Sequence, residues 1–420
     1  MEVKNVSELL NKCTAAKHAA EHMARVSTVT KDNALRAMAQ ALIDGTDELL
    51  KANSVDLSNA EKNGVRPAML DRLRLTPERI QDIAEGVRQV AALGDPIGEV
   101  TGEWTRPNGL VIGRRRVPMG VIAIIYEARP NVTADAAALC LKTSNVSILR
   151  GGKEAIASNT AMMSIMQRAA YSAGIPEGAL NIIEDTSRET ATELMRMNGY
   201  IDLLIPRGGK GLIKSVVENA TVPVVETAAG NCHVYVDGAA DPDMAERIVM
   251  NAKVQRPSVC NAAETLLIDR KIAAEFVPKI FKALSDAGVE IRADEASAAI
   301  YGGKTERATD EDYYTEYNDY IIAVKIVDGV DGAIEHINKY NTKHSEAIIT
   351  DSYSASEKFL SEVDAAAVYV NASTRFTDGF EFGFGAEIGI STQKMHARGP
   401  MGLTELTTVK YLINGNGQIR

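Results

Sequence analysis

One cysteine, Cys260, stands in a stretch whose residue types suit nucleophilic chemistry. The stretch reads Gln255-Arg256-Pro257-Ser258-Val259-Cys260-Asn261-Ala262-Ala263-Glu264. A cation precedes the sulfur by four residues, and the Pro-Ser step ends the helical pattern just upstream. Nearby cations or oriented backbone N–H groups lower the pKa of a thiol and so favour nucleophilic attack. The alternative is a packing residue, because free cysteine is among the most often buried residue types.

Two glycine loops with cations are candidate phosphate sites. Arg150-Gly151-Gly152-Lys153 follows the apolar run 146–149, and Pro206-Arg207-Gly208-Gly209-Lys210-Gly211 follows the run 201–205. Each loop precedes a helical pattern, and glycine lets the backbone approach an anion at the free N–H groups of a helix N-terminus. Neither loop is GxGxxG or a Walker A sequence, so a plain strand-to-helix turn remains the alternative for each. Two such loops on neighbouring strands indicate a dinucleotide or a doubly phosphorylated ligand.

A carboxylate and an amide follow two other predicted strands. Glu226 comes after the run 222–225, where it could act as a general base or cap the next turn. Asn131 ends the segment Tyr126-Glu127-Ala128-Arg129-Pro130-Asn131, where it could donate to a developing oxyanion or serve as a turn residue. His18 and His22 lie four apart on one helical face, but no third ligand is evident, so no metal site is predicted.

An alternation of short β runs and helical patterns has to position these residues. Residues up to about 97 are predicted to be helical, and Arg106-Pro107-Asn108-Gly109 predicts a hairpin over 98–117. Strands are expected at 121–126, 146–149, 181–183, 201–205 and 222–225, with helices at 133–142, 154–173, 187–197 and 210–219 between them. A second alternation has helices at 241–254 and up to 287, with strands at 265–268, 321–327, 347–350, 367–370 and 406–413. This pattern predicts an α/β protein with two mostly parallel sheets, whose ligands bind beyond the carboxyl ends of the strands.

The same pattern predicts a division into domains. Residues 1–97 and 118–228 are expected to form a dinucleotide-binding domain, and residues 229–403 a catalytic domain that carries Cys260. The hairpin 98–117 and the tail 404–420 are expected to form a small β element that contacts a second subunit, with a plain surface ribbon as the alternative. The protein is therefore expected to be a homo-oligomer.

Composition and charge narrow the partners. Lys plus Arg number 46 against 56 for Asp plus Glu, which gives a formal charge of −10. Such an acidic chain argues against nucleic acid and anionic membranes and favours a small-molecule substrate. We expect no signal peptide at the start and no membrane span, and the four cysteines form no CxxC pair. These features predict a cytoplasmic protein with reduced thiols.

Taken together, these motifs resemble the aldehyde dehydrogenase superfamily and, more closely, its acyl-phosphate branch, the gamma-glutamyl phosphate reductase family. The resemblance covers nearly the whole chain. Its specific parts are Tyr126 to Thr133, Pro206 to Gly211, Glu226 to His233, Val254 to Ala263, Asn371 to Gly379 and Ser391 to Gly402. The sequence differs from general aldehyde dehydrogenases in having Pro130 where they usually have Trp, and Thr227-Ala228-Ala229 after the glutamate in place of Leu-Gly-Gly.

The resemblance implies roles for individual residues. Cys260 takes the position of the nucleophile and Asn131 that of the oxyanion donor, while Glu226 is a candidate for proton transfer. Arg150, Gly151, Gly152 and Lys153 would bind the adenosine ribose and its phosphate, Pro206, Arg207, Gly208 and Gly209 form the second cofactor loop, and Glu316 would reach the nicotinamide ribose. Arg256, Ser258, His344, Arg375 and Arg398 are the candidates for binding the substrate phosphate and α-carboxylate.

The implied reaction is the NADPH-dependent reduction of L-glutamyl 5-phosphate to L-glutamate 5-semialdehyde in proline biosynthesis, through a thioester on the cysteine and with release of phosphate. NADPH is expected over NADH because Arg150 and Lys153 suit a 2′-phosphate. Glutamate 5-kinase is a candidate partner. Two alternatives remain: a hydrolytic aldehyde dehydrogenase in which Glu226 activates water, and a nucleotide-binding module without catalytic activity.

Overall fold

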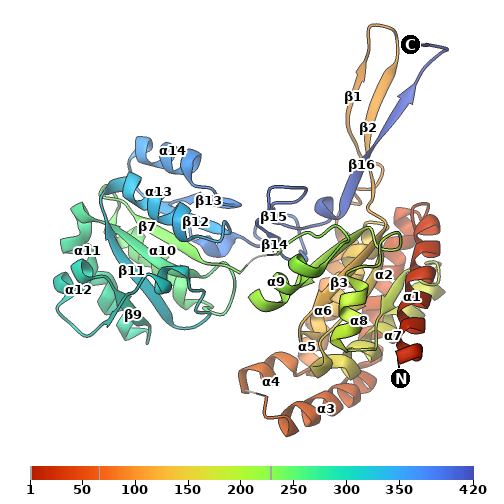
Figure 1. The fold of residues 1–420 in the computed structure, drawn as a ribbon, viewed down its shortest axis with the longest axis horizontal. Coiled ribbons are helices and arrows are strands. Elements are labelled where there is room, and N and C mark those ends of the chain that lie inside the picture. Colours follow the sequence, from red (N-terminus) through yellow and green to blue (C-terminus); the bar gives the residue numbers. More distant parts are fainter. Residues whose placement is uncertain (1, 66, 228) are drawn as a thin grey trace. The chain divides into compact units, whose positions relative to one another are not determined.

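The computed structural model describes residues 2–65, 67–227 and 229–420, which form two compact units (Figure 1). The first unit contains the described residues up to Thr227 together with Gly383–Gly389 and Met401–Arg420. The second contains residues 229–382 together with Ile390–Pro400. Ala228, which belongs to the predicted Glu226 motif, lies outside the described residues. None of the described helices has the length and apolar character needed to cross a bilayer.

The sheet of the first unit is parallel, with the strand order β5-β4-β3-β6. Its strands are β3 (Val121–Tyr126), β4 (Val146–Arg150), β5 (Leu180–Ile182) and β6 (Leu203–Arg207). The chain progresses from β3 through β4 to β5 and then returns to β6 on the other side of β3. The direction of progression therefore reverses at β3, and ligands of such sheets bind beyond the carboxyl ends of the strands at this reversal. Both glycine loops and Asn131 follow strands at this edge.

Helices pack around this sheet, and the chain before the first strand is mostly helical. They are α1 (Glu2–Met23), α2 (Thr28–Asp44), α3 (Thr46–Lys62), α4 (Pro67–Leu73), α5 (Pro77–Ala92), α6 (Pro130–Lys142), η1 (Lys153–Ala155), α7 (Ile156–Ser172), α8 (Arg188–Leu194), α9 (Lys210–Asn219) and η4 (Thr404–Leu406). Helix α5 begins as the sequence predicts, because the Thr76 side chain accepts a hydrogen bond from the Arg79 N–H and Pro77 occupies the first turn. Helix α6 is buried on nearly all sides, since α2, α5 and α7 pack around it.

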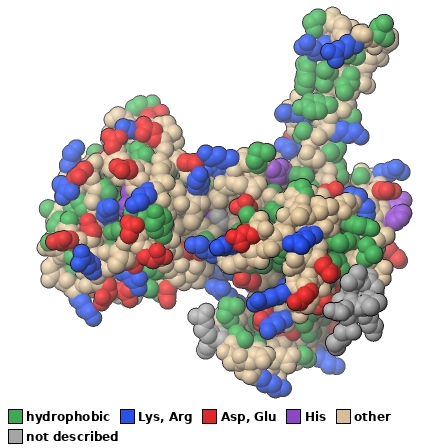
Figure 2. All heavy atoms as spheres, viewed as in Figure 1, with side chains coloured by type: hydrophobic (Ala, Val, Ile, Leu, Met, Phe, Trp, Pro, Cys, Tyr) green, Lys and Arg blue, Asp and Glu red, His purple; other side chains and the backbone are tan. Residues whose placement is uncertain are grey.

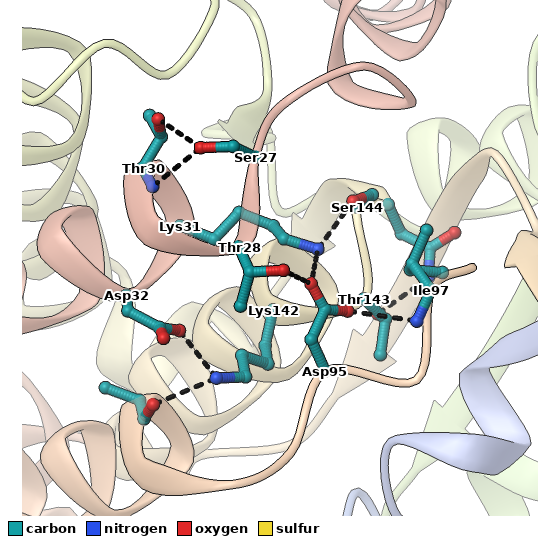
Figure 3. Close-up of polar contacts among 12 residues, drawn as sticks. Ser27, Thr28, Thr30, Lys31, Asp32, Asp95, Ile97, Lys142, Thr143 and Ser144 are labelled. Carbon is teal, nitrogen blue, oxygen red and sulfur yellow. Dashed lines mark hydrogen bonds and ion pairs between the residues drawn. The ribbon is translucent and has the colours of Figure 1, made fainter. Parts of the chain in front are cut away.

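A buried ion pair ties α2 to the segment that leads into the ribbon (Figure 3). The Lys31 and Asp95 side chains are 1% and 7% exposed, with Nζ and Oδ2 2.6 Å apart. Burial alone would raise the pKa of Asp95, but hydrogen bonds from Lys31, Thr28 and the Ile97 N–H outweigh it and the pKa is lowered. Removing one partner of such a pair typically costs about 3–5 kcal/mol of stability, because the other charge stays buried.

A second buried lysine anchors the end of α6 (Figure 3). Lys142, fully buried, donates to Asp32 of α2 and to the Ala91 carbonyl at the end of α5. The helix that begins at Pro130 and Asn131 is therefore fixed at its other end by charge as well as by packing.

Three antiparallel strands form a ribbon that belongs to the first unit. Strand β1 (Val100–Thr105) pairs with β2 (Val111–Pro118), and β16 (Thr407–Asn414) pairs with the other edge of β2. The turn between β1 and β2 is closed by hydrogen bonds from the Arg106 N–H to the Leu110 carbonyl and from the Gly109 N–H to the Arg106 carbonyl. Gly109 adopts the positive φ that glycine favours. The predicted hairpin and C-terminal strand are thus confirmed, and they form one sheet.

One face of this ribbon is apolar although it is exposed. The pairing register places Trp104, Ile112 and Ile413 in one row, with Tyr411 in the next row on the same side. The rings of Trp104 and Tyr411 meet edge to face, 6.3 Å apart, and Trp104, Tyr411 and Ile413 are 43%, 52% and 59% exposed. Figure 2 shows apolar and basic side chains along the ribbon. We call this the ribbon face.

The second unit is built on a parallel sheet of seven strands in the order β10-β9-β11-β8-β7-β12-β13. The strands are β7 (Cys232–Val236), β8 (Ala263–Asp269), β9 (Glu290–Ala293), β10 (Glu306–Arg307), β11 (Ile321–Val327), β12 (Ser345–Ile349) and β13 (Ala367–Val370). Alternate residues face opposite cores: Val234 and Leu266 join one apolar cluster, and Tyr235 and Leu267 join the other.

Helices cover both faces of the second sheet. They are α10 (Pro242–Val254), α11 (Arg270–Asp286), α12 (Glu295–Tyr301), α13 (Gly329–Tyr340) and α14 (Tyr353–Glu362), with short 3₁₀ turns η2 (Glu311–Tyr314) and η3 (Thr374–Phe376). Strands β14 (Ile390–Ser391) and β15 (Gly399–Pro400) form a separate pair. The two parallel sheets expected from the sequence are confirmed.

Three local predictions were wrong. The expected strand 222–225 is reduced to a single bridge between Leu204 and Val224, because Pro223 has no N–H to continue a ladder. Helix α6 begins at Pro130, so Asn131 lies in its first turn and not in a loop. Strand β7 was not among the predicted strands, although it is buried near the centre of the second sheet.

Candidate active site

The cysteine loop, residues 255–262, connects the end of α10 to the start of β8, as the sequence predicts. A buried ion pair closes its base, since Lys253 Nζ lies 2.5 Å from Glu264 Oε2 and both side chains are fully buried. The other Glu264 oxygen accepts a hydrogen bond from the Asn318 N–H. Burial lowers the pKa of Lys253 and raises that of Glu264, and the attraction between them opposes both changes. The two ends of the loop are therefore held together from within the core.

The backbone of Cys260 is held from the side by the segment that enters β7. A Cβ at Gly230 would lie only 1.4 Å from the Cys260 carbonyl oxygen, so no other residue fits there without displacement of the cysteine. The Cys232 thiol donates to the same oxygen at 3.2 Å. Burial raises the pKa of Cys232 well above its ordinary value, which keeps it a protonated donor. Cys260 is half-buried, and all four cysteines are free thiols.

Asn261 links the cysteine loop to the predicted C-terminal motif. Its side-chain NH₂ group donates to the backbone carbonyls of Arg375 and Thr377. Its backbone carbonyl accepts a hydrogen bond from the Thr374 hydroxyl. The Arg375 guanidinium in turn donates to the Asn261 side chain and to Gln255. The motif around Arg375, more than 100 positions away in the sequence, thus packs directly on the cysteine loop.

Positive charge gathers beside Cys260. Burial lowers the pKa of Arg375, the neighbouring Arg256 guanidinium lowers it further, and Cys260 acts in the opposite direction. Arg256 is exposed and Ser258 is half-buried in the same loop. Arg256 and Arg375 therefore lie near Cys260, and Ser258 belongs to the same loop. Cations beside a thiol in general favour its thiolate form.

The other two substrate candidates lie in different surroundings. His344 is fully buried, with Nδ1 2.8 Å from the Ser345 hydroxyl and 3.8 Å from Cys232 Sγ. It therefore contacts Cys232 and is not exposed to solvent in this conformation. Arg398 pairs with Asp364, which also contacts Lys343 and Lys394. The bonds from Arg398 and the two lysines hold the pKa of Asp364 far below its ordinary value.

Glu316, which the family resemblance assigns to the nicotinamide ribose, contacts the segment that enters β7 in this conformation. Its Oε1 accepts a hydrogen bond from the Gly230 N–H at 2.7 Å.

Among the described residues, no three His, Cys, Asp or Glu side chains are grouped so that they could hold a metal ion.

The two cations of the glycine loop after β4 have different surroundings. The half-buried Arg150 donates to the carbonyls of Thr186 and Ser187, so its guanidinium fixes the turn before α8. Burial lowers the pKa of Arg150. Lys153 is exposed at the start of η1. Of the two predicted phosphate cations, Lys153 is the one that faces solvent.

The loop after β6 already binds an anion. Gly209 is the N-cap of α9, and its N–H donates to Glu127 Oε1 at 3.0 Å. A Cβ at Gly208 would lie 2.7 Å from the Glu127 carboxyl carbon. Pro206 is buried, Arg207 is half-buried, and the Pro206 carbonyl accepts from the Thr227 hydroxyl. The site at this helix N-terminus therefore suits an anionic group.

Asn131 is exposed in the first turn of α6, where its side-chain amide donates to Asp135 Oδ2 at 3.1 Å. Glu226 is half-buried just after the short bridge to β6. Sequence reasoning identified Asn131 and Glu226 but missed Asp135, Glu127, Gly230 and the Lys253–Glu264 pair. The i, i+4 spacing of Asn131 and Asp135 was the one sequence pattern that could have indicated their contact. It was missed because the helix was predicted to begin at 133.

Comparison with known proteins places this architecture. The sequence profile of the aldehyde dehydrogenase family matches residues 2–304. Gamma-glutamyl phosphate reductases from Clostridium beijerinckii and Carboxydothermus hydrogenoformans are 60% and 61% identical to this chain over 415 residues, which covers 99% of the chain and 100% of each relative. The crystal structure of gamma-glutamyl phosphate reductase from Thermotoga maritima is similar with a TM-score of 0.97 at 49% identity, covering 98% of this chain and 100% of that one.

Two parallel-sheet units, one of which presents a cysteine on the loop before a central strand, define an aldehyde dehydrogenase, and the chain belongs to that family. Such proteins are oxidoreductases. Within the family it belongs to the gamma-glutamyl phosphate reductases.

The contact at Gly230 predicts that even a methyl group there disables the cysteine. We expect Gly230→Ala to lower kcat by about a hundredfold, because displacing a reacting group by roughly 1 Å costs that much. It should also slow alkylation of Cys260, measured by mass spectrometry of the labelled peptide. Gly332→Ala in α13 is the matched control, since its Cβ would make only an ordinary contact with Val327. Normal turnover in Gly230→Ala would show that the nucleophile tolerates displacement.

Proposed function

We propose that this protein reduces L-glutamyl 5-phosphate to L-glutamate 5-semialdehyde, with release of phosphate, in the cytoplasmic pathway to proline. The observation that carries the proposal is the cysteine loop, where Cys260 is held by its backbone and lies in one cluster with Arg256 and Arg375. Membership of the gamma-glutamyl phosphate reductases supports this choice of substrate.

The proposed chemistry begins with attack of the Cys260 thiolate on the acyl carbon of the substrate. A C–S bond forms as the C–O bond to phosphate breaks, which leaves a thioester and free phosphate. The guanidinium groups beside the sulfur can stabilise both the thiolate and the departing phosphate, because charge-assisted bonds to phosphate are strong. Asn131 is the proposed donor to the oxyanion that forms at the acyl oxygen.

The residues of the first unit fit a nicotinamide dinucleotide. The N-terminus of α9 already accommodates the Glu127 carboxylate, so the Pro206–Gly209 loop can receive an anion, and Lys153 offers an exposed cation. Gly151, Gly152 and the Arg150-supported turn would line the adenosine ribose, and Glu316 remains the candidate for the second ribose. When bound, the reduced cofactor would supply a hydride to the acyl carbon of the thioester. The C–S bond then breaks, which releases the aldehyde and returns the Cys260 thiolate.

The reductase has two rivals. A hydrolytic aldehyde dehydrogenase would use Glu226 as the base that activates water, and that residue is present. A nucleotide-binding module without activity would need no reactive thiol. The acyl phosphate substrate forms by phosphoryl transfer to a carboxylate, which is the reaction of a kinase. Because acyl phosphates hydrolyse in water, direct delivery would protect the substrate, so glutamate 5-kinase is the proposed partner.

The reverse reaction tests the function directly. With glutamate 5-semialdehyde, reduction of NADP⁺ should depend on phosphate, and Cys260→Ala should abolish it while cofactor binding, measured by titration calorimetry, stays near normal. Oxidation of the aldehyde without phosphate would instead identify the hydrolytic enzyme. A thiol at position 260 that resists a substrate-like electrophile at neutral pH would identify the module without activity.

The preference for NADPH is tested at Lys153. We expect Lys153→Met to raise the KM for NADPH about tenfold with little change for NADH, since one charge-assisted bond to a 2′-phosphate contributes about 1.5–3 kcal/mol. Lys214→Met, at an exposed lysine of α9, is the control. Arg150 is a poorer probe, because its guanidinium also supports the turn at Thr186. An equal rise for both cofactors would remove the 2′-phosphate from the proposal.

We also propose that a second copy of the chain covers the ribbon face. Strands β1 and β16 have unpaired edges within the described chain, and exposed strand edges beside an apolar face invite pairing. Trp104→Ser combined with Ile413→Ser should therefore yield a smaller species by light scattering after gel filtration. Val29→Ser, at an exposed valine of α2, should leave the mass unchanged. A wild-type protein that is monomeric at micromolar concentration would refute this interface.

A further inference from the structure

We propose that Asp135 is a positioning residue that fixes the orientation of the Asn131 side-chain amide, an inference that rests on the proposed role of Asn131 as oxyanion donor. Both residues lie on α6, four positions apart, so their side chains meet on one face of the helix. Asn131 Nδ2 lies 3.1 Å from Asp135 Oδ2. Neither the family resemblance nor the cofactor loops assign a role to Asp135.

The chemistry of the two groups makes this contact directional. The asparagine side chain ends in an NH₂ group with two N–H donors and in a carbonyl oxygen that accepts. A carboxylate only accepts, so an ionised Asp135 binds the NH₂ end of Asn131 and repels the oxygen end. One N–H of the Asn131 amide donates to Asp135. The second N–H points away from Asp135 and, because Asn131 is exposed, is available to a ligand. An amide without such a partner can present its oxygen instead, which would repel an oxyanion.

The surroundings of Asp135 favour a role in function over one in stability. Asp135 is half-buried, and the partial loss of water around its carboxyl raises the pKa to about 6, while the bond from Asn131 and the charge of Arg207 at the end of β6 act in the opposite direction. A Cβ on Gly86 of α5 would lie 3.8 Å from Asp135 Oδ1, so this helix packs beside the carboxylate. A carboxyl whose folded pKa exceeds its unfolded value stabilises the fold only while protonated, and this contribution is lost as the pH rises through about 6.

Ionised Asp135 therefore costs stability at neutral pH, where the proposed reaction needs it. An i, i+4 amide–carboxylate pair by itself adds only about 0.2–0.5 kcal/mol to a helix. The two roles thus make opposite predictions for an isosteric neutral replacement: a structural role predicts a less stable protein, and a positioning role predicts a protein at least as stable but slower.

The test is Asp135→Asn in the full-length protein, assayed by phosphate-dependent NADP⁺ reduction with glutamate 5-semialdehyde. An asparagine at 135 can bind either end of the Asn131 amide, so we expect kcat to fall roughly tenfold, less than the loss of about a hundredfold or more that follows removal of an oxyanion donor. The KM values should stay within about twofold and the Tm at neutral pH should stay equal or rise. In the wild type kcat should fall as the pH drops through about 6, and in Asp135→Asn this fall should be absent.

Two controls separate the outcomes. Asp44→Asn neutralises the carboxylate of a matched pair on α2, where Gln40 donates to Asp44 across the same i, i+4 spacing, and should change neither kcat nor its pH profile. Asn131→Ala should lower kcat at least as far as Asp135→Asn. An unchanged kcat and pH profile in Asp135→Asn, or a lower Tm with an unchanged pH profile, would overturn the positioning role. A wild type without phosphate-dependent activity would instead overturn the proposed function, before any variant is compared.

Discussion

The contact between the Cys260 carbonyl and the backbone of Gly230 is the constraint on which the second unit depends. Two strands, β7 and β8, lie side by side in the sheet, and the segments that enter them meet where a side chain has no room. The Cys232 thiol completes the contact by donating to the same carbonyl oxygen. Cys260 is thus held through its backbone, and its half-buried side chain is not needed for these contacts.

Buried charge supports functional segments in both units, at a cost in stability. The Lys253–Glu264 pair closes the cysteine loop, and the Lys142–Asp32 pair anchors the helix whose first turn holds Asn131. The Lys31–Asp95 pair ties α2 to the segment that leads into the ribbon. Well-packed apolar residues would often be as stable or more so, because desolvation opposes every buried ion. Such pairs instead require one arrangement of their partners, which suits segments that have to be held in place.

The predictable part of the site consists of residues adjacent in sequence. The two glycine loops and the cysteine loop follow or precede apolar runs, so their elements could be inferred from periodicity and turn chemistry. Proline explains two of the errors, since Pro223 interrupts the expected strand and Pro130 begins a helix where a loop was expected. Arg150 shows the limit of residue type: a cation in a glycine loop suggested a phosphate, yet its guanidinium is directed at two backbone carbonyls.

The sequence by itself determined the α/β class, the two alternating blocks, the hairpin and the chemically active residue types, because these follow from local periodicity and from motifs that resemble a known family. Only the tertiary structure decided what holds Cys260, because Gly230, Cys232 and Arg375 reach it from segments separated by 28 to more than 100 positions, and pairing over such distances leaves no local pattern. The same holds for Glu127 at the N-terminus of α9, which directly follows β3, a strand that pairs with β6 in the sheet and is distant from it in the chain. The cysteine was visible in the sequence, but the reason that it can lie in only one place was not.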